Sequence, residues 1–356
     1  MNAPVVAPER KGPATAIHPG GPAPVPTSPL PMAQAINAGL RAAMGRDETV
    51  ILMGEDIGRL GGVFRVTDGL QAEFGEDRVR DTPLAESGIV GTAIGMALAG
   101  YRPVVEIQFD GFIFPAFDQI TTQLAKLHYR SGGDVEVPVV IRVPYGGDIG
   151  AIEHHSESPE ALFAHTAGLR VVSPSSSADA FTMIQQAIAS PDPVLFLEPK
   201  ARYWSRGELP ATVDLTPDGV VAGLSHARTV RSGTDVTLAG YGPTVATLLK
   251  AAAAAAEDGV SAEVIDLRSI SPLDVDAVAA SVRRTGRLVV AHEAPTYFGP
   301  GAELAARVSE ECFYALEAPV LRVGGFHTPY PANRHEHDYL PNLDRILDAV
   351  GRSLDH

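Results

Sequence analysis

Residues 81–109, DTPLAESGIVGTAIGMALAGYRPVVEIQF, contain a predicted helix followed by a predicted strand. Apolar and small residues fill 87–99, and Gly100 follows them as a residue suited to the left-handed conformation that ends many helices. The run from Arg102 to Phe109 then favours a strand. The stretch therefore predicts one helix–strand unit of an α/β protein.

The alternation of helix and strand extends in both directions from this stretch. Runs such as VPVVIRVP (137–144) and PVLFLEP (193–199) are almost continuously apolar, which is typical of strands buried on both faces of a parallel sheet. In the first half of the chain, helices are expected at 32–45, 113–130 and 178–189, and strands at 49–53, 137–143, 170–173 and 194–197. In the second half, strands are expected at 235–239, 262–267, 287–292 and 320–323, and helices at 243–257, 274–284, 301–315 and 342–354. The predicted fold class is α/β, with two domains that are each a mainly parallel sheet covered by helices.

The length of 356 residues also favours two domains. We expect a proline-rich disordered tail at 1–30, a first αβ domain at 31–203, a linker at 204–232 and a second αβ domain at 233–356. Residues 1–31 hold nine of the 29 prolines, which forbid a transit helix, and contain no apolar core of a signal peptide.

Composition excludes several classes of function. The net charge of −15 disfavours general binding to nucleic acid, because phosphate backbones would be repelled. No apolar run reaches the roughly 18–20 residues that a membrane span needs. Cys312 is the only cysteine, so an internal disulfide and a cysteine metal site are excluded. We expect a reducing compartment, and with the excess of alanine and arginine a bacterial cytoplasm.

The glycines of the opening stretch do not form a nucleotide-binding motif. Gly88, Gly91 and Gly95 lie on one helix face but lack the G-x-G-x-x-G pattern, which gives little support to an NAD site and favours close backbone packing. Glu86 precedes this helix. It is either a carboxylate favoured by the helix dipole or a functional acid, and its position alone does not decide between them.

Three further segments carry candidate side chains. Phenylalanines 109, 112, 114 and 117 are mostly expected in the core. His154 and His155 are adjacent, so a two-histidine metal site is improbable, and one of them in a polar loop is a catalytic candidate. The tetrapeptide His-Glu-His-Asp at 335–338 permits a metal site, but a solvated loop is favoured. A hydrolase is disfavoured, because the motif G-x-S-x-G is absent.

Eight collinear segments resemble the β subunit of the thiamine-diphosphate-dependent 2-oxo acid dehydrogenases, in the transketolase-like family. They are GEDIGRLGGVFRVTDGL (54–70), DTPLAESGIVG (81–91), EIQFDGFIFPAFDQI (106–120), HHSESPEALFAHTAGLRVVSP (154–174), FLEPK (196–200), VIDLRSISPLD (264–274), HEAP (292–295) and GGFHTPYP (324–331). The resemblance implies a pyrimidine-binding domain followed by a transketolase C-terminal-like domain. The third and fourth segments look most like the branched-chain (2-oxoisovalerate) members.

The resemblance implies a role for each residue that matches the family motif. Glu86 matches the glutamate that hydrogen-bonds the aminopyrimidine ring of the cofactor and so favours loss of a proton from its thiazolium carbon. Such an acid works best with its pKa raised by apolar neighbours. Phe112 matches an aromatic residue against the pyrimidine, often tyrosine in relatives, and Leu84 matches a residue that lines the same ring.

Further roles are implied for a histidine and for a potassium ion. His155 matches a histidine near the substrate and the incoming lipoyl group, whereas His154 stands where relatives differ and is given no role. A structural K⁺ is implied near residues that differ in identity from the family, namely Val137, Val139, Val140, Ala187 and Asp192.

The diphosphate half of a thiamine site is missing from the chain. Thiamine enzymes bind Mg²⁺ through a GDG motif and an asparagine about thirty residues later, and this sequence has no GDG. Gly147-Asp148 has no asparagine at the required distance. The resemblance therefore implies an α subunit that supplies Mg²⁺ in an α₂β₂ heterotetramer, and it argues against a single-chain transketolase.

The expected function is oxidative decarboxylation of a branched-chain 2-oxo acid of the 3-methyl-2-oxobutanoate type. The acyl group would pass to the lipoyl group of a dihydrolipoamide acyltransferase. The alternatives are the same subunit of a pyruvate or acetoin dehydrogenase and, in another class, a non-catalytic assembly subunit. Glu86 and His155 argue against the last alternative.

Overall fold

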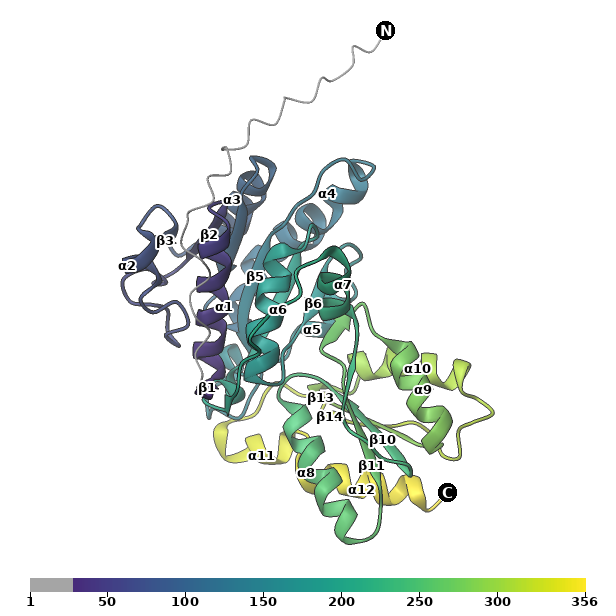
Figure 1. The fold of residues 1–356 in the computed structure, drawn as a ribbon. Helices are drawn as coiled ribbons and strands as arrows, with labels where there is room; N and C mark the ends of the chain where they lie inside the picture. Colours follow the sequence, from purple (N-terminus) through teal and green to yellow (C-terminus); the bar gives the residue numbers. More distant parts are fainter. Residues whose placement is uncertain (1–27) are drawn as a thin grey trace.

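The computed structural model describes residues 28–356, which form two sheets that are each covered by helices (Figure 1). The first sheet has the strand order β12-β6-β7-β5-β4-β2-β3. Its strands are β2 (Val50–Gly54), β3 (Val79–Asp81), β4 (Arg102–Glu106), β5 (Val140–Tyr145), β6 (Arg170–Val172), β7 (Val194–Pro199) and β12 (Ser269–Ser271). Six of these strands are parallel, and only β12 pairs antiparallel, with β6.

Helices cover both faces of the first sheet because its strands alternate their side chains. Val50 and Leu52 of β2 pack in one apolar cluster with α1 (Met32–Arg46) and α6 (Ser177–Ala189). Ile51 and Met53 point the other way and pack with α3 (Glu86–Leu98) and η1 (Asp110–Ala116). The shorter helices of this domain are α2 (Leu70–Phe74), η2 (Gln119–Leu124), α4 (Ala125–Arg130), η3 (Glu153–His155), α5 (Glu160–Ala164) and η4 (Lys200–Arg202).

The second sheet has the order β14-β13-β10-β11-β9 and lies below the first in Figure 1. Its strands are β9 (Arg228–Arg231), β10 (Val236–Gly240), β11 (Ala262–Asp266), β13 (Leu288–Pro295) and β14 (Leu321–Gly325), of which β9 is antiparallel. Its helices are α8 (Thr244–Glu257), α9 (Val275–Thr285), α10 (Pro300–Glu311), η5 (Asn333–His335), α11 (Glu336–Tyr339) and α12 (Leu343–Leu354). The prediction of two mainly parallel sheets covered by helices is confirmed.

Two predicted elements differ from the structure in form. The helix expected at 113–130 is three pieces, η1, the π-helical η2 and α4. Pro115 lies inside η1, where it cannot donate an α-helical hydrogen bond and clashes with the preceding turn. The strand expected at 102–109 ends at Glu106, and η1 begins at Asp110. The shorter strand moves the next residues from the sheet to its edge.

The segments at the predicted domain boundaries carry ordered structure. Residues 1–27 of the expected tail lie outside the described residues, while Leu30 pairs with Gly207 in the short ladder of β1 (Leu30–Pro31) and β8 (Arg206–Gly207). The expected linker at 204–232 contains β8, α7 (Pro217–Ser225) and β9. Helix α7 packs on α6, with the Gln186 side-chain amide donating to the Gly219 carbonyl at 3.0 Å.

The second domain also completes the first sheet. Strand β12 follows β11 in the chain but pairs with β6, and the Ser173 amide donates to the Arg268 carbonyl at 2.9 Å. The apolar cluster that contains Ile51 continues into Ile265 and Val290 of the second sheet. The two domains therefore share one core and one strand.

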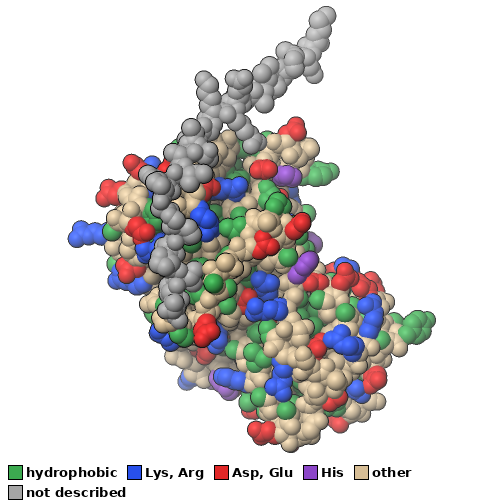
Figure 2. Space-filling view, viewed as in Figure 1, with side chains coloured by type: hydrophobic (Ala, Val, Ile, Leu, Met, Phe, Trp, Pro, Cys, Tyr) green, Lys and Arg blue, Asp and Glu red, His purple; other side chains and the backbone are tan. Residues whose placement is uncertain are grey.

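No helix among residues 28–356 is long and apolar enough to cross a membrane. Acidic and basic side chains are interspersed over the face shown in Figure 2, so the negative net charge is not gathered there into one patch.

A buried ionic network joins three neighbouring strands of the first sheet. The Arg142 guanidinium of β5 donates to Glu106 of β4 at 2.7 Å and to Glu198 of β7 at 2.6 and 3.0 Å. Burial raises the pKa of Glu106, whereas the two carboxylates raise the pKa of Arg142. Tyr203 donates to Glu198 at 2.6 Å, so each group is satisfied inside the sheet.

We expect Arg142→Leu to destabilise the chain by about 3–5 kcal/mol, because two buried carboxylates would lose their cation. The matched control is Arg352→Leu, which removes an exposed ion pair with Asp348 and should change the free energy of unfolding by at most about 1 kcal/mol. Denaturant unfolding followed by circular dichroism measures both. Equal stability of the two variants would contradict a role for the network.

Candidate active site

The predicted site residues follow the carboxyl ends of neighbouring strands in the first sheet. Glu86 begins α3 after β3, Phe112 lies in η1 after β4, and His155 ends η3 after β5. Since these strands are parallel, their carboxyl ends share one edge of the sheet, where ligands of open α/β sheets bind. The early end of β4 brings η1 to this edge.

The His155 ring lies in an aromatic corner. It stacks on Phe109 with ring centroids 3.9 Å apart and an interplanar angle of 14°, and it meets the edge of Phe112 at 5.3 Å and 86°. Its Nδ1 atom is buried and has no hydrogen-bond partner among the described residues. The structure therefore places His155 beside Phe112 and also beside Phe109, which was expected in the core.

Glu86 is a nearly buried carboxylate, 8% exposed, that makes no hydrogen bond or ion pair with the described residues. Helix α3 packs on η1, which carries Phe112. A second acid lies close: burial raises the pKa of Glu55, and the charge of Glu86 raises it further. Sequence reasoning missed Glu55, although it directly follows Gly54, the last residue of β2, at the same sheet edge.

Apolar side chains and glycines near Glu86 face outward. Leu84 is 80% exposed, two residues before the helix begins. Gly91 and Gly95 of α3 are exposed, and no atom of the described chain lies within 4 Å of a Cβ built on either. The close packing expected of these glycines is thus not made by other residues of the described part of the chain, 28–356.

The segments proposed for K⁺ meet at the opposite edge of the sheet, before β5. The Val137 amide donates to the Pro191 carbonyl at 3.1 Å, next to Asp192. The carbonyls of Val137, Val139 and Ala187 each accept a backbone hydrogen bond, and the Asp192 carboxylate pairs with Arg170 at 3.2 Å. Val140 belongs to β5 itself. A K⁺ site here stays a prediction.

Residues 335–338 do not form the solvated loop that was expected, because His335 ends η5 and Glu336 begins α11. His335 and His337 are exposed, but Glu336 is buried and accepts the Asp148 and Gly150 amides at 2.9 and 3.1 Å. Tyr330 also donates to Glu336, at 2.6 Å. Within residues 28–356 there is no group of three or more His, Cys, Asp or Glu side chains that could hold a metal.

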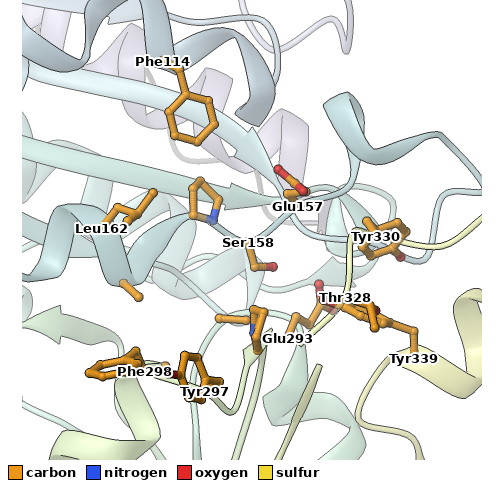
Figure 3. A pocket seen from close by; sticks show the side chains of 15 residues that line it. Phe114, Glu157, Ser158, Leu162, Glu293, Tyr297, Phe298, Thr328, Tyr330 and Tyr339 are labelled. Atoms are coloured by element: carbon orange, nitrogen blue, oxygen red, sulfur yellow. The ribbon is translucent and has the colours of Figure 1, made fainter. Parts of the chain in front are cut away.

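The segment between β5 and α5, residues 146–159, contains His155 and is called the His155 loop. A cavity of about 230 Å³ lies between the domains beside this loop (Figure 3). Phe114 and Leu162 line it from the first domain, and Tyr297 and Phe298 line it from the second. Its polar wall includes Glu293, whose pKa burial raises to about 7. Sequence analysis gave no signal for this cavity, because its residues are far apart in the chain.

The comparisons with known proteins agree with this arrangement. The family models of the transketolase pyrimidine-binding domain and the transketolase C-terminal domain match residues 28–204 and 225–346. A pyruvate dehydrogenase E1 component subunit beta of Leifsonia xyli is 60% identical, over 91% of this chain and 95% of that protein. A 3-methyl-2-oxobutanoate dehydrogenase subunit beta of Mycobacterium tuberculosis is 55% identical, over 92% and 93%.

The chain belongs to the transketolase-like β subunits of 2-oxo acid dehydrogenase E1 components. A solved structure described as a split gene transketolase, inactive beta4 tetramer, has a TM-score of 0.73 and covers 92% of this chain and 98% of its own. At 21% identity this likeness concerns the fold.

The residues of this β subunit fit one half of thiamine diphosphate, the cofactor that the family implies. The nearly buried Glu86 carboxylate has no partner and could form a hydrogen bond with a ring nitrogen of the pyrimidine. The Phe112 ring and the exposed Leu84 side chain offer apolar surface to the flat ring. No cluster of metal-binding side chains for the diphosphate is present among the described residues.

Proposed function

We propose that this β subunit supplies the pyrimidine half of a thiamine diphosphate site for the oxidative decarboxylation of a 2-oxo acid. The observation that carries the proposal is the position of Glu86, nearly buried and without a partner at the sheet edge that also holds Phe112 and His155. When bound, thiamine diphosphate supplies a nucleophilic carbon and an electron sink.

Glu86 holds and returns a proton at the pyrimidine ring nitrogen. A carboxyl that exchanges a proton at this nitrogen would let bound thiamine diphosphate supply its carbon nucleophile. Burial, and then the nearby charge of Glu86, raise the pKa of Glu55, so a second carboxyl at this edge holds a proton more readily. Phe112 and Leu84 hold the ring plane and exclude water from it.

His155 acts later, on the 2-oxo carboxylate or on a proton during acyl transfer. Its Nδ1 has no partner in the described chain, so the ring is not committed to a structural hydrogen bond. A fixed imidazole near neutral pH can accept or donate a proton.

The other half of the site comes from an α subunit, which holds Mg²⁺, in a heterotetramer of two α and two β subunits. The absence of a GDG motif supports this proposal, as do exposed Leu84 and the open glycine face of α3, which suit close approach of another chain.

The acyl group passes to a lipoyl-bearing dihydrolipoamide acyltransferase, and K⁺ is a further ligand, bound near Val137. A bacterial cytoplasm fits the single buried cysteine, Cys312.

For the substrate we favour a branched-chain 2-oxo acid of the 3-methyl-2-oxobutanoate type, on the segments 106–120 and 154–174 that resemble branched-chain members. A second candidate is pyruvate, because the 60% identical relative is a pyruvate dehydrogenase subunit.

Steady-state rates of the reconstituted α and β pair should decide the substrate. We expect kcat/KM on 3-methyl-2-oxobutanoate to exceed that on pyruvate by about tenfold or more, since the added methyl groups contribute about 1–3 kcal/mol in a fitted apolar pocket. The matched control is the same α subunit with a β subunit of known specificity. A preference for pyruvate would establish the second candidate instead.

Glu86→Gln and His155→Ala should fail at different steps. Glu86→Gln cannot cycle a proton, so deuterium exchange at the thiazolium carbon should slow by about 10²–10⁴-fold in the reconstituted complex. In His155→Ala the exchange should stay near normal while the overall rate falls. Equally fast exchange in both variants would show that Glu86 is not the activating acid, and full overall activity of Glu86→Gln would favour a non-catalytic subunit.

A further inference from the structure

Asp110 and Lys200 form a fully buried ion pair directly beneath the His155 loop. The Lys200 Nζ donates to Asp110 Oδ1 at 2.5 Å, and both side chains are 0% exposed. Asp110 begins η1 after β4, and Lys200 begins η4 after β7. The pair thus joins two strand ends at the edge of the sheet that carries the candidate site.

The pair contacts the His155 loop from two directions. The second oxygen of Asp110 accepts the Glu157 amide at 2.9 Å, two residues beyond His155. The Lys200 ammonium lies 5.7 Å from the centroid of the Phe109 ring, which stacks on His155. One end of the pair therefore holds the loop backbone, and the other lies against the ring that supports the imidazole.

The loop backbone has little freedom to move toward the pair. A Cβ on Gly111 would come within 2.6 Å of the His154 carbonyl oxygen, so only glycine fits between η1 and the loop. The Gly146 amide donates to the Glu157 carbonyl at 3.0 Å, which closes the base of the loop. Asp110 is thus the buried side chain that fixes the loop at the turn after His155.

Stability alone does not account for an ion pair in this place. Desolvation of two buried charges offsets most of their attraction, and apolar replacements of such pairs are often neutral or stabilising. Burial also raises the pKa of Asp110 to about 6, against the opposing effect of Lys200, and lowers the pKa of Lys200. Both charges are kept despite the free-energy cost of burying them. This favours a role in positioning the neighbouring loop and the Phe109 ring.

We propose that Asp110 and Lys200 are positioning residues, which hold the His155 imidazole at the site by fixing its loop and its stacking partner. The proposal deepens the proposed function and rests on it for the catalytic consequence. Neither residue contacts the reacting atoms in this account.

The first test measures the position of His155 without reference to activity. Asp110→Asn and Lys200→Met are labelled with diethyl pyrocarbonate in the reconstituted complex, and carbethoxylation of His155 is followed by peptide mass spectrometry. We expect both variants to label faster than the unaltered complex. The matched control is Glu263→Gln, which alters a buried carboxylate paired with Arg284 in the second sheet and should leave His155 labelling unchanged. Unchanged labelling in Asp110→Asn and Lys200→Met would overturn the proposal, whatever His155 does in catalysis.

The second test asks whether the pair acts through His155. Overall rates are measured for Asp110→Asn, His155→Ala and the double variant, with thiazolium exchange as the check that the cofactor half-site is intact. We expect exchange near normal in all three, and a double variant no slower than His155→Ala, because the loss in Asp110→Asn is the loss of His155. Multiplied losses, or exchange that collapses in Asp110→Asn, would mean a general structural role and overturn the proposal. Full activity of His155→Ala would instead count against the proposed function, and labelling would still decide the positioning.

Discussion

The site depends on one constraint: the parallel strands of the first sheet all have their carboxyl-terminal ends at the same edge of the sheet. Parallel strands place the residues that follow them side by side, however distant they are in sequence. Glu55 follows β2, Glu86 follows β3, Asp110 follows β4, His155 follows β5 and Lys200 follows β7. The buried Arg142 network ties the three central strands together, so the edge is held as a unit. Two acids, an aromatic corner and a histidine therefore share one edge of the sheet, although no local sequence motif contains all of them.

The second domain contributes to this edge through its carboxylates. Glu293 accepts the Gly147 amide at 2.8 Å, and Glu336 accepts the amides of Asp148 and Gly150. Tyr241 donates to Glu160 at 2.6 Å across the same boundary. The backbone on both sides of the His155 loop is thus fixed by buried acids of the other domain or by Asp110. Together with β12, these contacts explain why the two sheets act as one scaffold.

The sequence predicted the elements and the adjacent site residues better than it predicted the contacts that hold them. Apolar runs such as PVLFLEP located buried strands, because such strands are apolar on both faces. Motif matching selected His155 and Phe112, and the structure places their rings in contact. Pro115 inside the expected helix, β12 in the first sheet and the roles of Glu336 and Lys200 could not be read from local pattern, since each depends on long-range packing. The assignment of Glu86 to the cofactor rests on resemblance and on its unpartnered, nearly buried position.

The central claim is that this β subunit holds half of a thiamine diphosphate site. Isothermal titration calorimetry of thiamine diphosphate with Mg²⁺ tests it most directly, on the chain alone and on the chain reconstituted with its α subunit. The account predicts weak binding without dependence on Mg²⁺ for the chain alone, because the proposed contacts of Glu86, Phe112 and Leu84 are with the pyrimidine only. It predicts tight, Mg²⁺-dependent binding for the reconstituted complex. Tight, Mg²⁺-dependent binding to the chain alone would contradict the account.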